Sequence, residues 1–111
     1  MIATTLEPPP TGNGPEVLPF VLGKAEEMRP DARYAFVCQA LQDRAELGKK
    51  KYGTYLRAQN GRNPAIDYFQ ELLDAVMYAG QCLMENKLAG IYFWATLNLT
   101  ICVAEAIMEK N

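Results

Sequence analysis

The chain has 111 residues, of which half are hydrophobic and 22% are charged, and its formal net charge is −2 at pH 7. This composition is typical of one folded domain, and a domain so small has a modest core that association with a second copy would enlarge. The small charge gives no electrostatic basis for nucleic-acid binding, which draws on many Lys and Arg contacts to phosphate. Because the chain has no His, Ser-His-Asp and Cys-His catalysis and His-ligated zinc are excluded.

The three cysteines, Cys38, Cys82 and Cys102, each lie in an apolar helical pattern. An odd number of such cysteines favours reduced thiols over a disulfide framework. The N-terminus also lacks the basic segment and apolar run of a secretory signal. We therefore expect a cytoplasmic protein.

Residues 1–19 contain three consecutive prolines at 8–10 and a Gly-Asn-Gly sequence at 12–14, both of which interrupt helix and strand. They predict a flexible or extended N-terminal arm over residues 1–19. A short apolar stretch, residues 17–22, is suited to docking on the body of the protein. Residues 20–111 are predicted to form a single helical domain.

Two amphipathic helices are predicted next. Asp31 can cap a helix over residues 31–51, in which apolar residues three or four positions apart predict one buried face: Tyr34, Val37, Cys38, Leu41 and Ala45. Residues 52–62 contain two glycines and predict a loop. Asn63 and Pro64 then predict a helix start, because Asn caps free N–H groups and proline suits the first helical position. The apolar stripe of this helix continues to residue 85.

The last predicted helix runs from residue 87 or 88 to residue 110 and is apolar on nearly all sides. Such a helix is buried between subunits or spans a membrane, and residues 88–104 approach the length of a membrane span. Polar residues interrupt the run and Glu105 ends it, which favours the subunit interface. We predict an all-α bundle of three to four helices, completed by homo-oligomerisation through this C-terminal helix, with no membrane or nucleic-acid partner.

Acidic side chains recur at helical spacing on both amphipathic helices. Asp67, Glu71 and Asp74 share one face of the second helix, and Asp43 and Glu46 are neighbours on the first. The second helix contains no Lys or Arg that could relieve the repulsion. Carboxylates from two helices can bind Mg²⁺ or Mn²⁺, although a solvated acidic face is the simpler interpretation of the spacing alone.

Basic and aromatic residues lie between the two acidic groups. Cations such as Lys50 and Arg62 near an acidic metal site suit a triphosphate, whose charge Mg²⁺ neutralises only in part. The alternative for Lys50 is an ordinary ion pair with Glu46, four residues earlier. Tyr52 and Tyr55 could stack on a base or seal the edge of a core.

Residues 44–56 (RAELGKKKYGTYL), residues 60–62 (NGR) and residues 67–74 (DYFQELLD) resemble small bacteriophage proteins of the MazG-like group. These are relatives of the all-α nucleoside triphosphate pyrophosphohydrolases, and the resemblance covers residues 36–85. In that superfamily one helix bears Glu-x-x-Glu and a second bears Glu-x-x-Asp, and the four carboxylates bind Mg²⁺ that activates water. Glu71 and Asp74 match the second pair, whereas Asp43 and Glu46 occupy the places of the first, with Asp43 one methylene shorter than Glu.

The resemblance implies Mg²⁺-dependent (or Mn²⁺-dependent) hydrolysis of a (deoxy)nucleoside triphosphate to a monophosphate and pyrophosphate, in the host cytoplasm if a phage encodes the protein. Glu46, Glu71 and Asp74 would be the catalytic ligands and Asp43 a fourth metal ligand. The substrate-binding residues would be Lys50, Tyr52, Asn60 and Arg62. An oligomer that binds or sequesters a nucleotide without hydrolysing it is the alternative.

Overall fold

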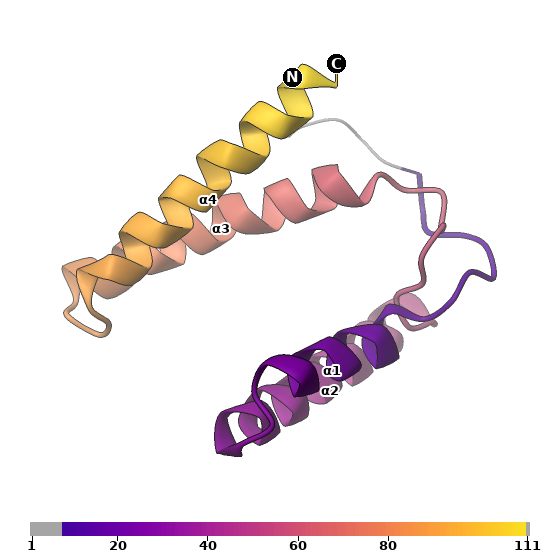
Figure 1. Cartoon of the computed structure of the whole chain (residues 1–111). Coiled ribbons are helices and arrows are strands. Elements are labelled where there is room, and N and C mark those ends of the chain that lie inside the picture. Colours follow the sequence, from indigo (N-terminus) through magenta and orange to yellow (C-terminus); the bar gives the residue numbers. More distant parts are fainter. Residues whose placement is uncertain (1–7, 111) are drawn as a thin grey trace. The chain divides into compact units, whose positions relative to one another are not determined.

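The computed structural model describes residues 8–110 and is all-α over that range, as predicted (Figure 1). Its four helices are α1 (Val17–Met28), α2 (Ala32–Tyr52), α3 (Pro64–Met84) and α4 (Gly90–Glu109). The described residues form two compact units, of which one comprises residues 9–61 with α1 and α2. The other comprises Pro8 and residues 62–110 with α3 and α4.

Helix α1 begins inside the segment predicted to be an arm. Residues 1–7 of that segment lie outside the described range, but residues 17–19 are helical. Pro19 is the third residue of α1, where the backbone N–H of any residue would have no acceptor within the helix. A proline there removes no helical hydrogen bond, so the interpretation of Pro19 as part of an extended segment was wrong. The predicted docking stretch, residues 17–22, is the start of α1, which packs against α2.

The residues before α1 pair with the loop after α2 inside the same unit. The N–H groups of Thr11 and Val17 donate to the carbonyls of Asn60 and Leu56, at 2.6 and 2.9 Å. In the opposite sense, Ala58 N–H donates to the Pro15 carbonyl at 2.8 Å. These bonds make residues 11–17 an antiparallel partner of residues 56–60, with a single bridge between Glu16 and Arg57.

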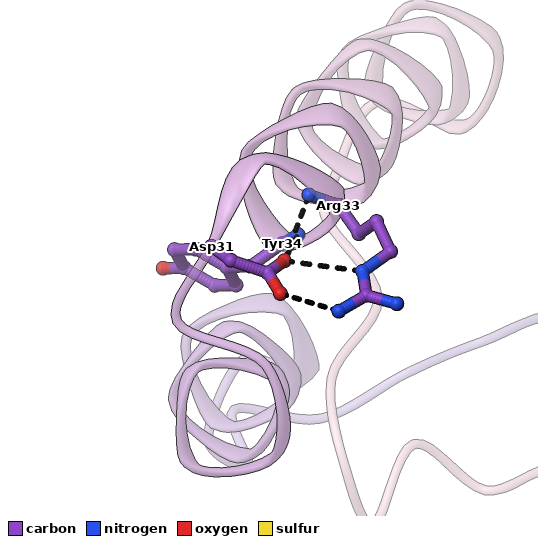
Figure 2. A network of polar contacts seen from close by, with 3 residues as sticks. All are labelled: Asp31, Arg33 and Tyr34. Carbon is purple, nitrogen blue, oxygen red and sulfur yellow. Dashed lines mark hydrogen bonds and ion pairs between the residues drawn. The ribbon is translucent and has the colours of Figure 1, made fainter.

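Local signals set both ends of α2. The Asp31 carboxylate accepts from the N–H groups of Arg33 and Tyr34 and also forms an ion pair with the Arg33 guanidinium at 2.7 Å (Figure 2). That guanidinium holds the pKa of the Asp31 carboxyl below its usual value. The helix ends at Gly53, whose left-handed backbone (φ 81°) lets its N–H reach the Lys49 carbonyl.

The predicted buried face of α2 is only half-buried. Tyr34, Cys38, Leu41 and Ala45 are partly covered, whereas Val37 is exposed, contrary to the prediction. No described residue of α1 or α2 is fully buried. Two packed helices cover only one side of each other, which explains why the rest of the α2 stripe remains open to solvent.

Helices α3 and α4 form an antiparallel hairpin with a small core (Figure 1). Ile66 and Phe69 of α3 are buried with Ile107 of α4, and Val103 and Ala104 pack against them. Leu72 and Thr100 are also buried, and the Thr100 hydroxyl is satisfied by the Thr96 carbonyl at 2.7 Å. Asn63 caps α3 by accepting from Ala65 N–H at 3.0 Å, as its sequence predicted.

Helix α4 begins at Gly90 and not at the predicted residue 87 or 88, because the residues before Gly90 form the turn that follows α3. Asn86 adopts a left-handed backbone (φ 57°), and the N–H groups of Asn86 and Lys87 donate to the carbonyls of Leu83 and Cys82. This is a Schellman motif, which uses these residues to close α3. By length and composition alone α4 could also cross a membrane, but the core helices of soluble proteins can be as long and as apolar.

Candidate acidic sites on two helices

The first acidic pair lies on an exposed part of α2. Asp43 and Glu46 are three residues apart and therefore share one side of the helix. Asp43 Oδ1 accepts a hydrogen bond of 2.9 Å from the side-chain amide of Gln39, and the Glu46 carboxylate accepts one from the Tyr55 hydroxyl. Among residues 8–110 neither carboxylate forms an ion pair. Both therefore keep oxygen lone pairs that no cation occupies.

Tyr55 joins this pair to the neighbouring lysines. Its hydroxyl donates to Glu46, and the Lys49 ammonium lies 4.6 Å from the centroid of its ring. Donation to a carboxylate raises the pKa of the Tyr55 hydroxyl, because loss of its proton would leave two anions in contact. The bond also holds one oxygen of Glu46 in place. The structure thus gives Tyr55 a contact that neither base stacking nor core sealing had suggested.

The three acids of α3 share the face that points away from α4. Glu71 and Asp74 are exposed, and within the described part of the chain neither has an ion pair or a side-chain hydrogen bond. They are three residues apart on a helix that contains no Lys or Arg. Their mutual repulsion is therefore relieved only by solvent and salt.

Arg62 neutralises Asp67, the third acid of α3, for which the helical pattern predicts no cationic partner. Its guanidinium donates twice to Asp67, at 2.9 and 2.7 Å, and once to the Pro8 carbonyl at 2.8 Å. This two-pronged contact holds the pKa of the Asp67 carboxyl below its usual value. Arg62 lies in the loop before α3, so a helical pattern could not reveal the pair. A phosphate that binds Arg62 must compete with Asp67.

The remaining predicted substrate-binding residues lie in the α1–α2 unit. Lys50 is exposed, and within residues 8–110 it forms no ion pair, so the alternative of an ion pair with Glu46 is not seen. Tyr52 is exposed beneath the Lys51 ammonium, which lies 5.2 Å from its ring centroid. Asn60 is half-buried, and its backbone carbonyl accepts from Thr11.

The structure brings together the members of each acidic pair, and the two pairs belong to different compact units. Within residues 8–110, no group of three or more Cys, Asp or Glu side chains is arranged to hold a metal ion. The donor chemistry of each pair nevertheless fits a hard cation, because Mg²⁺ prefers carboxylate oxygens and keeps several of its own waters.

No protein-family model, curated protein or solved structure matches this chain. The resemblance of residues 36–85 to the MazG-like group therefore stays a prediction, as do the roles that it implies for the acids. What the structure adds is the local environment of each side chain.

Proposed function

We propose that the protein is a cytoplasmic, Mg²⁺-dependent or Mn²⁺-dependent nucleoside triphosphate pyrophosphohydrolase that acts on a (deoxy)nucleotide. The observation that carries this proposal is the exposure of two carboxylate pairs, one on α2 and one on α3, whose members have no cationic partner among residues 8–110. Like charges at this helical spacing cost about 0.2–0.5 kcal/mol per pair. A bound divalent cation would reverse that cost.

The reaction replaces one phosphoanhydride bond. The oxygen of water adds to the α-phosphorus, the bond from that phosphorus to the bridging oxygen of the β-phosphate breaks, and the products are a nucleoside monophosphate, pyrophosphate and a proton. The carboxylate pair of each unit, Asp43 with Glu46 on α2 and Glu71 with Asp74 on α3, would hold Mg²⁺, which would neutralise phosphate charge and lower the pKa of a bound water.

The chain's own cations and hydrogen bonds have separate roles in this proposal. Tyr55 donates to Glu46 and so limits the orientations of that carboxylate. Lys50 is exposed and without an ion pair in the described residues, so its ammonium is available to phosphate oxygens. Arg62 can serve the same purpose only by exchanging Asp67 for phosphate, and Tyr52 and Asn60 complete the proposed nucleotide-binding residues.

The test is a screen of nucleoside triphosphates and their deoxy forms with Mg²⁺ and with Mn²⁺, scored for pyrophosphate release and for thermal shift. We expect one or a few substrates to be hydrolysed, and Glu71→Gln or Asp74→Asn to lower kcat/KM by at least about a hundredfold. Glu109→Gln is the matched control, because it removes one exposed negative charge at the end of α4 and should leave kcat/KM unchanged.

Two outcomes would contradict the proposed hydrolase function, and each would point to a different role for the protein. Saturable nucleotide binding without turnover in either metal would make the protein a nucleotide-sequestering module. If neither metal nor nucleotide shifts the melting temperature, and Glu71→Gln and Asp74→Asn only stabilise the fold, the acids form a solvated face and the metal site is wrong.

A further inference from the structure

Helix α4 exposes a second apolar stripe away from the one that packs on α3. Its positions alternate three and four residues apart, as in a helix that packs along a partner helix. The single tryptophan, Trp94, is 63% exposed in this stripe, and Ile101 is 49% exposed. Four of its six exposed positions are apolar, Ile91, Trp94, Ile101 and Met108, and the other two are Asn98 and Glu105.

Helix α3 extends this stripe into a broader face. Met77 and Met84 are exposed and seven residues apart, so they lie above one another on α3. Helical-wheel geometry places them to one side of the stripe that packs on α4, and antiparallel α4 presents its own exposed stripe to that same side. We call the stripe of α4 together with Met77 and Met84 the hairpin face.

The size of the hairpin face suits a protein interface. A helix of 20 residues is about 30 Å long, and two packed helices are about 20 Å across. One whole side of the hairpin, which includes the hairpin face, therefore measures roughly 600 Å² as a flat outline, of the same order as the ~800 Å² that each partner buries in a stable complex. Exposed apolar faces of this extent are often interaction sites in soluble proteins.

The polar residues of the face identify its occupant. Asn98 lies near the middle of α4, and its amide both donates and accepts, so it can pair with the same amide across a two-fold axis. A parallel arrangement would place Glu105 beside Glu105 of the copy, whereas an antiparallel one separates them. The antiparallel arrangement also brings Lys87, just before α4, toward Glu109 at the far end of α4 in the copy. A lipid surface would offer Asn98 no such partner.

From these features we propose that the hairpin face binds a second copy of this chain, with the two α4 helices antiparallel and crossing near Asn98. This inference goes beyond the proposed hydrolase activity and does not depend on it. It identifies the helix stripe, the orientation and the polar residue that sets the register of the pair.

The first test is the oligomeric state, measured by sedimentation equilibrium at micromolar concentration. We expect a dimer, and we expect Ile101→Glu to raise its dissociation constant by about thirtyfold or more. Leu99→Glu is the matched control, because Leu99 is similarly exposed (44%) on the other side of α4 and should leave the dimer intact. A monomeric wild type, or equal weakening by both substitutions, would overturn the proposal, as would binding of a monomer to phospholipid vesicles.

Trp94 provides a readout that does not depend on hydrodynamics. We expect its emission to shift to longer wavelength on dilution as the dimer dissociates and solvent reaches the indole. Unchanged emission over a concentration range that dissociates the dimer would place the interface elsewhere.

The second test concerns orientation and uses a chain in which Cys38, Cys82 and Cys102 are replaced by Ser or Ala. In that background Asn98→Cys should form an intermolecular disulfide on mild oxidation, and Met108→Cys should not, because an antiparallel pair keeps its helix ends apart. Efficient cross-linking through position 108 would instead show a parallel pair, and cross-linking at neither position would overturn the proposed crossing point.

Discussion

The Arg62–Asp67 ion pair is the contact by which a loop side chain changes the charge balance of α3. Its two side chains are 25% and 35% exposed, so solvent screens the pair in part, and its two-pronged geometry is favourable. Because the pKa of the Asp67 carboxyl is lowered in the folded chain, this stabilisation is fully present above the unfolded value of about 3.9. It is lost as the pH falls through the folded pKa.

We expect Asp67→Asn to lower the free energy of unfolding by about 0.5–1 kcal/mol at pH 7. Below the folded pKa of Asp67 the difference from the wild type should disappear, because the wild-type carboxyl is then neutral too. Urea unfolding followed by circular dichroism at pH 7 and in acid measures both values. Asp74→Asn is the control: the same substitution on the same helix removes an unpaired charge beside Glu71 and should not destabilise the chain. An equal loss for Asp67→Asn at both pH values would show that the effect is not electrostatic.

At the scale of elements, the contact between the segment before α1 and the loop after α2 depends on the absence of a side chain. A Cβ atom on Gly14 would lie 2.0 Å from the Ala58 carbonyl oxygen, which real structures do not allow. The hydrogen bonds that flank this contact, from Ala58 to Pro15 and from Val17 to Leu56, require the two backbones to stay close. Gly14 is therefore required by packing rather than by chain flexibility.

We expect Gly14→Ala to lower the free energy of unfolding by about 1–3 kcal/mol, since the backbones must separate to admit the methyl group. Gly23→Ala makes the same change inside α1 where nothing lies within 4 Å, and it should raise stability by about 0.5–1 kcal/mol through helix propensity. Amide exchange at Ala58 should accelerate in the first variant alone. If both variants were stabilised equally, the pairing of residues 11–17 with residues 56–60 would be wrong.

The start of a helix could be predicted to within a residue where an N-cap side chain in the sequence marks it. Asp31 and the Asn63-Pro64 pair specify the starts of α2 and α3 with their own side chains. The start of α1 could not be predicted, because a proline that ends a helix elsewhere is tolerated in its first turn. The start of α4 depends on the turn in which Asn86 closes α3.

In the candidate site, too, relations within one helix could be predicted and contacts made through a loop could not. Spacing predicts that Glu71 and Asp74 share a face, because the relation lies within one helix. The contacts of Tyr55 with Glu46 and of Arg62 with Asp67 depend on the path of a loop, which spacing does not specify. The binding of a metal ion and a nucleotide by each carboxylate pair therefore remains the proposal that the metal and nucleotide screen decides.

At the scale of the whole molecule, stability and association should be linked. The four buried apolar side chains among residues 8–110, those of Ile66, Phe69, Leu72 and Ile107, all belong to the α3–α4 hairpin, so its core is small. A face that is apolar but exposed in the single chain adds to that core only when a second copy covers it. The folded dimer is then favoured over unfolded chains by mass action.

The melting temperature should therefore rise with protein concentration, by about 3 °C for each tenfold increase, because a dimer gains about 1.4 kcal/mol per tenfold. Differential scanning calorimetry across two decades of concentration measures this slope. Ile101→Glu should melt lower and lose the dependence, since a charge three residues from the crossing point at Asn98 would be buried between the two helices. Leu99→Glu should retain the wild-type slope. A wild-type melting temperature that is independent of concentration would show that the hairpin is stable without a second copy, because only association makes unfolding depend on the amount of protein present.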